Sequence, residues 1–255
     1  MTDPAIELQD VAYAIGGRRV LDGISMQIMP GEIVSVMGSS GSGKTTLLKL
    51  MTGLIRATSG AILVQGSDIT GMREDELDQV RLKMGLVFQY AALFDSMNVY
   101  DNILFGVTQH RRGLKRNERD EIVTRRLAQV DMAGVERLFP DELSGGMQKR
   151  VGLARALAME PNIVFYDEPT SGLDPITSRT IDELIVATRG STGVTSVIVS
   201  HDIGSVFRIS DRVAMLHGGK LVIFDTPDML RRSTIPAVRE FVSTAELAPA
   251  GAGGN

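Results

Sequence analysis

Short runs of apolar residues recur along the chain and predict strands that are covered on both faces. The clearest run spans residues 32–37, with the sequence Glu-Ile-Val-Ser-Val-Met, and similar runs fall at 60–65, 84–88, 163–167, 195–200 and 212–216. Uninterrupted apolar strands of this length are typical of parallel sheets, because helices cover both faces of such sheets. Helical patterns separate several of the runs, so we predict an α/β core built on a parallel sheet.

Residues 5–28 show a different pattern, in which turn-forming glycines separate short strands. We place turns at residues 16–17, Gly-Gly, and at residues 22–23, Asp-Gly. Strands joined by such short turns pair in antiparallel fashion. The sequence therefore predicts an N-terminal antiparallel β subdomain beside the parallel sheet.

The middle of the chain has no strand signal between Gln89 and about Pro161. Residues 115–130 and 148–159 are charged and helical in pattern. We interpret this stretch as an α-helical subdomain inserted into the α/β core. The division is a single domain over 1–245, with a core at about 1–89 and 160–235 and a helical lobe at about 90–160. A short amphipathic piece is predicted at 237–242, and the small residues of 246–255 predict a flexible tail.

Composition and charge exclude several functions. The net charge of −4 argues against a nucleic-acid partner, and the absence of cysteine excludes disulfides and thiolate metal sites. The first residues show no basic start followed by an apolar stretch, so no signal peptide is expected. The apolar runs are far shorter than a membrane span of roughly 20 residues, so any work at a membrane would be done through a partner. The basic residues crowded between 111 and 119 indicate a solvated helix face, with attraction to anionic lipid headgroups as the alternative.

A glycine-rich stretch after the strand at 32–37 has the spacing of a phosphate-binding loop. Glycines at 38, 41 and 43 are followed by Lys44 and Thr45, which fits G-x-x-x-x-G-K-[ST] between a strand and a helix beginning at Thr45. Such a loop turns backbone N–H groups toward phosphate oxygens, and the lysine adds a point charge. The threonine hydroxyl suits Mg²⁺. We therefore predict ATP and Mg²⁺ as ligands, with contacts from Gly38, Ser39, Ser40, Gly41, Ser42, Gly43, Lys44, Thr45 and Thr46.

Two adjacent carboxylates end the apolar strand at 163–167. Asp167 is the last residue of the strand, where it is placed to hold Mg²⁺, and Glu168 extends beyond it toward the terminal phosphate. There it can polarise the attacking water. An adjacent pair of acids is also typical of a solvated turn, and it is the combination with the phosphate loop that favours catalysis.

Residues 143–148, Leu-Ser-Gly-Gly-Met-Gln, decide the class, since the chain here resembles the ABC transporter ATPase family with its LSGGQ-like signature. Met147 departs from the glutamine that the signature most often has. The resemblance covers about residues 5–230 and implies a P-loop NTPase core of the ABC type. It also implies roles for Gln89 in contacts to Mg²⁺ and water, and for Asp174 in the D-loop. His201 resembles the switch histidine at the terminal phosphate, and Tyr13 the aromatic residue that stacks on adenine.

The signature residues stand directly before a predicted helix, as the phosphate loop does. Ser144, Gly145 and Gly146 would thus form a second anion-binding helix start, and an ordinary helix cap is the alternative. The family resemblance implies that each ATP lies between the phosphate loop of one subunit and this turn of the other. That arrangement is a two-fold homodimer with two equivalent sites.

Within the family, several segments resemble the ATPase of MCE-type (Mla) phospholipid transport systems: 92–103, 142–147 with Lys149 and Arg150, 172–177 and 238–242. The resemblance implies an integral membrane permease, an MCE substrate-binding protein and possibly a small STAS-domain protein as partners. It also implies a peripheral position on the cytoplasmic face of the inner membrane. We expect Tyr90 to Asn102 to contact the permease, with packing inside the lobe as the alternative for Leu93, Phe94, Met97 and Tyr100.

The predicted function is an ATP-hydrolysing motor that drives phospholipid transport between membranes of the cell envelope. One alternative is the ATPase of an importer for a small solute such as an amino acid, because substrate contacts lie in other chains. Another is an ABC ATPase acting in translation or DNA maintenance. The chain has neither the second ATPase unit nor the long coiled-coil insert that such proteins usually carry.

Overall fold

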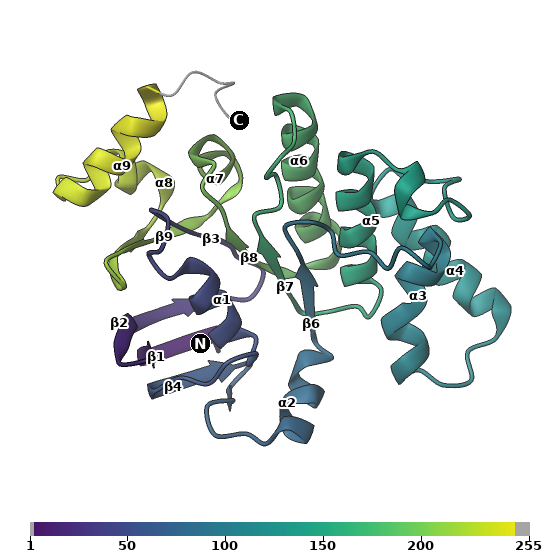
Figure 1. The fold of residues 1–255 in the computed structure, drawn as a ribbon, viewed down its shortest axis with the longest axis horizontal. Helices are drawn as coiled ribbons and strands as arrows, with labels where there is room; N and C mark the ends of the chain where they lie inside the picture. The colour runs from purple at the N-terminus through teal and green to yellow at the C-terminus, as the bar shows by residue number, and fades with distance from the viewer. Residues whose placement is uncertain (1–2, 248–255) are drawn as a thin grey trace.

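A computed structural model describes residues 3–247, and a six-stranded sheet forms its centre (Figure 1). The strand order in the described chain is β10 (Lys220–Asp225), β9 (Arg212–His217), β3 (Ile33–Gly38), β8 (Thr195–Val199), β7 (Ile163–Asp167) and β6 (Met84–Val87). All neighbours pair in parallel except β10, which runs antiparallel to β9. The predicted parallel sheet is confirmed, while β10 has no counterpart among the predicted strands.

An antiparallel sheet lies beside the first and consists of β2 (Arg18–Ile28), β1 (Ile6–Ile15), β4 (Ser59–Val64) and the short β5 (Ser67–Asp68). The predicted turn at residues 16–17 joins β1 to β2, and both of its glycines have positive φ. The predicted turn at 22–23 is wrong, because both residues lie inside β2. The register shifts there, so that Asp22 and Gly23 together oppose Ala12. Gly23 supplies the left-handed conformation of a bulge, not of a turn.

Helices cover both faces of the central sheet. They are α1 (Lys44–Met51), α2 (Glu74–Arg81), α3 (Val99–His110), α4 (Arg116–Gln129), α5 (Gly145–Leu157), α6 (Pro175–Thr192), α7 (Ile203–Ile209), α8 (Pro227–Arg231) and α9 (Pro236–Leu247), with a 3-10 turn at Pro140–Glu142. The helices α3, α4 and α5 lie together at one end of the molecule (Figure 1), and no strand interrupts residues 89–160, all of which are described. None of the helices in 3–247 is long and apolar enough to span a bilayer.

Three buried clusters explain why the strands are apolar on both faces. Val34 and Val36 of β3 face a cluster shared with α1 and the antiparallel sheet. Ile33 faces the opposite cluster, which α3 to α6 complete. Met37 joins a third cluster with α7, α8 and α9. Alternate side chains of β3 therefore pack into different hydrophobic clusters, which explains why the strand is apolar on both faces.

Several helices begin or end at other residues than the sequence predicts. The helix after the phosphate loop begins at Lys44, one residue before the predicted start, and ends at Met51. The signature helix α5 begins at Gly145, because Ser144 caps it. The last helix runs to Leu247 and so occupies the first two positions of the predicted tail. The rest of that tail lies outside the described residues.

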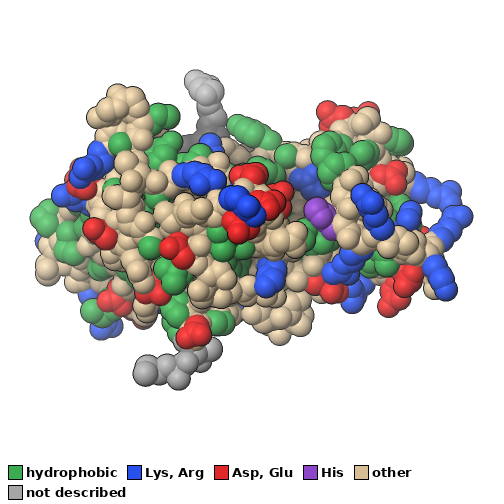
Figure 2. All heavy atoms as spheres, turned by 90° about the horizontal axis from the view of Figure 1, so that it is seen from below, with side chains coloured by type: hydrophobic (Ala, Val, Ile, Leu, Met, Phe, Trp, Pro, Cys, Tyr) green, Lys and Arg blue, Asp and Glu red, His purple; other side chains and the backbone are tan. Residues whose placement is uncertain are grey.

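Charged side chains of both signs share the face shown in Figure 2. Lys and Arg are most frequent toward the end where α3 and α4 lie, and Asp and Glu stand among them. Arg116 lies 3.9 Å from Asp120, and the main-chain N–H of Lys115 donates to Glu118. This mixture favours a solvated helix face for the basic stretch at 111–119.

Candidate nucleotide-binding site

The phosphate loop connects the end of β3 to the start of α1, and two of its glycines leave no room for a side chain. A Cβ on Gly38 would lie 2.2 Å from the carbonyl oxygen of Leu216, and one on Gly43 would lie 2.5 Å from the side chain of Leu21. Both glycines have positive φ, 148° and 103°. The loop therefore forms only with glycine at these positions.

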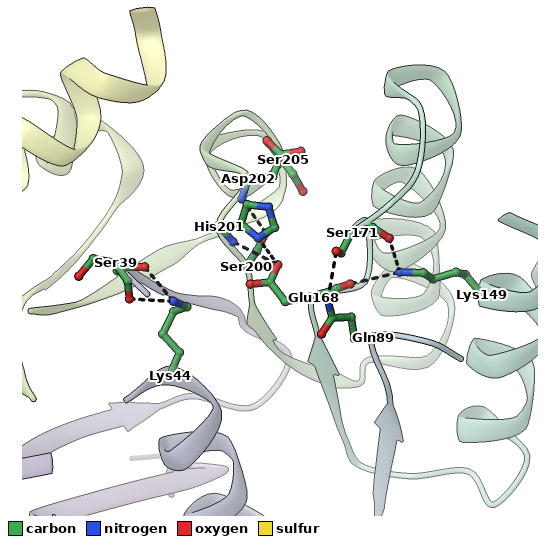
Figure 3. A network of polar contacts seen from close by, with 11 residues as sticks. Ser39, Lys44, Gln89, Lys149, Glu168, Ser171, Ser200, His201, Asp202 and Ser205 are labelled. Atoms are coloured by element: carbon green, nitrogen blue, oxygen red, sulfur yellow. Dashed lines mark hydrogen bonds and ion pairs between the residues drawn. The ribbon is translucent and has the colours of Figure 1, made fainter. Parts of the chain in front are cut away.

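The start of α1 offers donors for an anion. Its N-cap, Gly43, contributes no side-chain hydrogen bond, and the first N–H groups of any helix lack partners within it. The Lys44 ammonium donates to the carbonyl oxygens of Gly38 (2.8 Å) and Ser39 (3.2 Å), which holds it over the loop (Figure 3). Burial lowers the pKa of Lys44, and the charges of Glu168 and Asp167 oppose this shift. Free N–H groups and a half-buried ammonium fit a phosphate chain.

Serine and threonine side chains complete the loop. Ser39, Ser40 and Thr45 are exposed, and Thr46 is half-buried at the first turn of α1. The Ser42 hydroxyl is buried and has no hydrogen-bond partner in the described structure. The loop thus carries one buried polar group that its own fold leaves unsatisfied, together with exposed hydroxyls facing outward from the helix start.

The two acids lie at the carboxyl end of β7. Asp167 is half-buried, and burial raises its pKa. The charge of Glu168 raises the pKa of Asp167 further, whereas the charges of Lys49 and Lys44 lower it. Glu168 has φ +50°, and its N–H donates to the Val199 carbonyl at 2.8 Å, which extends the pairing of β7 with β8. The left-handed backbone turns the Glu168 side chain away from the direction of the strand.

His201 meets Glu168 at the ends of these two neighbouring strands. The His201 Nδ1 lies 2.7 Å from Oε2 of Glu168, and the His201 N–H donates to the same oxygen at 3.3 Å (Figure 3). The Glu168 side chain is 15% exposed and the imidazole 67%. Adjacency of parallel strands thus brings together two residues that the sequence places 33 positions apart. The geometry can orient a carboxylate and an imidazole toward one water molecule.

The residues proposed for Mg²⁺ do not form a closed metal cage. Among residues 3–247 no group of three or more His, Asp or Glu side chains is arranged to hold a metal. Asp167 provides one carboxylate, and Thr45 provides a hydroxyl at the exposed helix start. Mg²⁺ is usually held by one or two protein oxygens together with substrate phosphates and water, so these residues fit it.

Gln89 follows β6 and is tied to the turn after the acids. Its Nε2 donates to the Ser171 hydroxyl at 3.2 Å (Figure 3). Tyr13 lies on β1 opposite Leu21, the residue whose side chain bounds Gly43. Tyr13 is half-buried and packs against the hydrophobic cluster that contains Leu21.

The signature turn has the form of a second helix start. The Ser144 hydroxyl accepts the N–H of Met147 at 3.3 Å and caps α5, and Gly145 is exposed. A Cβ on Gly146 would lie 2.6 Å from the Thr177 side chain. Asp174 caps α6 in the same region by accepting the N–H groups of Ile176 and Thr177.

Within one chain the two helix starts lie apart. Helix α5 packs against α3, α4 and α6, whereas α1 packs against the antiparallel sheet and β3 (Figure 1). No hydrogen bond joins the signature turn to the phosphate loop in the described chain. The expectation that they meet across two subunits stays a prediction.

The sequence drew attention to Lys149 only through the resemblance to MCE-type systems and gave it no role at the nucleotide site. Its ammonium donates to the main-chain carbonyls of Glu168 (3.2 Å) and Ser171 (3.0 Å), although the residue is buried (Figure 3). The signal was present in the helical pattern, because Lys149 stands four residues before Leu153 and eight before Leu157 on the apolar face of α5. A lysine on such a face needs a polar partner.

Comparisons with known proteins agree with this geometry. The family profile described as "ABC transporter" matches residues 21–171, which span the phosphate loop, the signature and both acids. The chain belongs to the ABC transporter family. As an ABC ATPase it binds and hydrolyses ATP for transport. Cassettes of this family dimerise and pair with permeases.

Relatives cover nearly the whole of this ABC ATPase. MlaF of Escherichia coli, an intermembrane phospholipid transport ATP-binding protein, is 39% identical over 93% of this chain and 88% of its own. TRIGALACTOSYLDIACYLGLYCEROL 3 of Arabidopsis thaliana is 39% identical over 95% and 74%. The probable ribonucleotide transport ATP-binding protein mkl of Mycobacterium leprae is 38% identical over 97% and 71%.

Solved cassettes share the fold. The cbiO1 protein of Clostridium perfringens, part of the cbiONQ transporter complex, has a TM-score of 0.83 at 28% identity, covering 95% of this chain and 99% of its own. A dimeric cassette in a post-hydrolysis state with ADP and Pi has a TM-score of 0.79 at 31% identity, covering 87% and 98%. The ABC ATPase fold with an N-terminal antiparallel sheet is thereby established.

Proposed function

We propose that this ABC ATPase drives phospholipid transport between membranes of the cell envelope. The support comes from MlaF, whose name assigns it to intermembrane phospholipid transport and which aligns along 93% of the chain. The segments that resemble MCE-type systems include 92–103, which leads into α3. The substrate itself would be bound by other subunits, so this chain contributes the ATP-driven step.

The contact between Glu168 and His201 carries the catalytic proposal. Glu168 acts as the general base that polarises the attacking water, and His201 orients the carboxylate and stabilises charge on the transferred phosphoryl group. Lys44 and the N–H groups of residues 38–46 hold the β- and γ-phosphates. Tyr13, beside the loop, stacks on the adenine.

Mg²⁺ fits the oxygen ligands that this chain supplies. Thr45, Asp167 and Gln89 would hold it with the phosphates, where it would neutralise charge that develops on the phosphoryl oxygens. Asp167 supplies the negative charge of this set. The Gln89 amide, which donates to Ser171 through Nε2, keeps its oxygen available.

Two copies of the chain complete each ATP site. The Ser144–Gly146 turn of one subunit caps the phosphates held by the loop of the other, and Asp174 lies at the contact between subunits. Ile176, two residues after Asp174, is 81% exposed, more than the other exposed aliphatic side chains of the described residues, Ile15 (62%) and Leu54 (52%) among them. In the proposed dimer the partner subunit covers this side chain.

The helical lobe, at about residues 90–160, is proposed to face the permease. Tyr90 is 83% exposed and Phe94 40% exposed, and the rings of Phe94 and Phe105 lie 4.5 Å apart. The second half of the proposed contact segment behaves differently. Asn102 is fully buried, and its amide binds the carbonyls of Phe94 and Met97. Asn102 therefore shapes the segment from inside while the aromatic residues contact the permease.

The same resemblance supports the proposed setting. The partners are an integral permease, an MCE substrate-binding protein and possibly a small STAS-domain protein, and the position is the cytoplasmic face of the inner membrane. A second candidate is import of a small solute, which the name of the mkl relative favours because it refers to ribonucleotide transport.

Isolation of the native complex tests the proposal. A tagged chain is purified from detergent-solubilised membranes, its partners are identified, and the complex is reconstituted between donor and acceptor vesicles that carry labelled phospholipid. We expect an MCE protein in the complex and ATP-dependent transfer of the lipid that the Glu168→Gln variant lacks. A solute-binding protein as partner, with ATP-dependent uptake of solute and no lipid transfer, would contradict phospholipid transport.

A further inference from the structure

Lys149 makes an unusual pair of contacts on the helix that begins with the signature. It lies one turn after Ser144 and is 7% exposed, and its two hydrogen-bond acceptors are main-chain carbonyls. An ammonium group in such a place loses most of its hydration, which is costly. The residue is buried enough that its pKa is lowered by desolvation, opposed by the charge of Glu168. Packing alone would be served better by an apolar side chain.

The two carbonyls belong to one tight turn. Glu168 and Ser171 are its ends, and the Ser171 N–H also donates to the Glu168 carbonyl at 3.2 Å. Glu168 enters the turn with φ +50°, a conformation that residues other than glycine rarely adopt. Lys149 therefore fastens both ends of a turn whose first residue is under backbone strain.

The same turn also anchors Gln89. The Ser171 hydroxyl accepts the Gln89 amide, while the Glu168 carboxylate meets His201 on the opposite side (Figure 3). The contacts form a continuous chain from α5 through Lys149 to the turn, and onward to both the glutamine and the histidine. A shift of α5 would move the carbonyl of Glu168 directly.

We propose that Lys149 is a positioning residue that ties the signature helix to the turn carrying Glu168. The proposal rests on the dimeric ATP site described above. In that dimer Ser144 contacts the ATP of one site, whereas Glu168 of the same chain acts in the other. Lys149 then transmits closure of one site to the general base of its neighbour, so that the two sites hydrolyse ATP cooperatively.

Substitutions of nearly equal length separate this role from packing. Lys149→Met keeps the length of the side chain and removes its donors, whereas Lys149→Arg keeps donors for both carbonyls. Lys83→Met serves as the control, because Lys83 is exposed and its side chain touches none of these residues. The ATPase rate of the purified protein is measured against ATP concentration, and ATP-dependent dimerisation is measured in a Glu168→Gln background.

We expect Lys149→Met to lower kcat about tenfold or more while KM for ATP and dimerisation stay near wild type. The Hill coefficient for ATP should fall toward one, and Lys149→Arg should restore most of kcat. An unchanged kcat and Hill coefficient would overturn the proposal. So would a loss of activity that merely follows lost ATP binding or a lower melting temperature. If Lys149→Met does not fold, the Lys149→Gln variant is used, which removes the charge and shortens the side chain. It should likewise lower kcat while KM stays near the wild-type value.

Failure of the proposed catalytic role of Glu168 can be told apart from failure of the role of Lys149. If Glu168→Gln hydrolyses ATP at the wild-type rate, the role of Glu168 as general base is wrong and the inference falls with it. If Glu168→Gln is inactive and Lys149→Met is normal, only the role of Lys149 is refuted.

Discussion

The imidazole of His201 and the carboxylate of Glu168 form a 2.7 Å contact across the ends of two adjacent parallel strands. Glu168 follows the last residue of β7 and His201 follows β8 by two residues, so the pairing of β7 with β8 is sufficient to bring them together. The exposed imidazole can accept new partners, whereas the carboxylate is largely enclosed. This asymmetry suits a histidine that reaches toward a ligand while it holds the base in place.

Replacement of His201 by alanine should slow hydrolysis without abolishing ATP binding. Loss of the imidazole frees the Glu168 carboxylate and removes one group that stabilises the transition state, so kcat should fall about a hundredfold. The measurement is steady-state ATPase activity alongside nucleotide binding. His217→Ala is the matched control, because His217 is exposed on β9 and contacts neither acid. A wild-type kcat in His201→Ala would exclude this role.

Gly38→Ala should destabilise the protein and weaken ATP binding together. The added Cβ would lie 2.2 Å from a main-chain oxygen and 2.7 Å from the Ser42 hydroxyl, at φ 148°. Main-chain atoms cannot move aside cheaply, so we expect a loss of roughly 2–4 kcal/mol in the free energy of unfolding. Urea denaturation and ATP titration check this. Gly71→Ala, at an exposed site with open space around it, should change neither quantity.

Ile176→Asp should weaken ATP-dependent dimerisation while leaving the monomer folded. The side chain is 81% exposed beside Asp174, so a charge costs the isolated chain little, but it would be buried against the partner subunit. We expect the dimer formed by Glu168→Gln with ATP to dissociate at least about tenfold more readily. Val186→Asp, on the same helix, is the control. Sedimentation or size exclusion with ATP measures the effect, and equal dimerisation of both variants would argue against this contact.

The strands and the phosphate loop could be predicted because their signals are local. An apolar run such as 32–37 predicts a buried strand from its own residues, and the spacing of Gly38, Gly43 and Lys44 defines the loop without any distant contact. The proximity of Glu168 and His201 could also be predicted, because each residue follows a buried strand. Membership of the ABC family followed from a motif of six residues at 143–148.

The features that were missed depend on contacts between distant segments. The bulge at Gly23 exists because β2 must stay in register with β1, so a local turn signal was misleading. The acceptors of Lys149 come from residues 19 and 22 positions later, which no periodicity displays. The apolar residues of the proposed contact segment drew attention, yet its polar residue Asn102 is fully buried, because its amide replaces the main-chain pairing that the loop lacks.

A buried carboxylate joins the helices that follow Asp174 and His201. Asp182 of α6 is fully buried, and it accepts the Ser205 hydroxyl at 2.6 Å and the Arg208 guanidinium, both from α7. Burial raises the pKa of Asp182, and the charge of Asp202 adds to the shift, while Ser205 and Arg208 oppose it. The carboxyl group thus binds a proton more tightly in the folded protein than in the unfolded chain.

This shift predicts how stability depends on pH. A raised folded-state pKa contributes stability that is fully present below the unfolded value of 3.8 and is lost as pH rises through the folded value. The free energy of unfolding of wild type minus that of Asp182→Asn should therefore decrease from roughly pH 4 to pH 7. Asp174→Asn should behave oppositely, since hydrogen bonds from Thr177 lower the pKa of Asp174, and its contribution is present above the unfolded value of 3.8 and lost as pH falls below it. Urea denaturation from about pH 2 to pH 7 measures both differences. Slopes of the same sign for the two variants, each in its own part of this range, would contradict the assignment of burial as the dominant cause at Asp182.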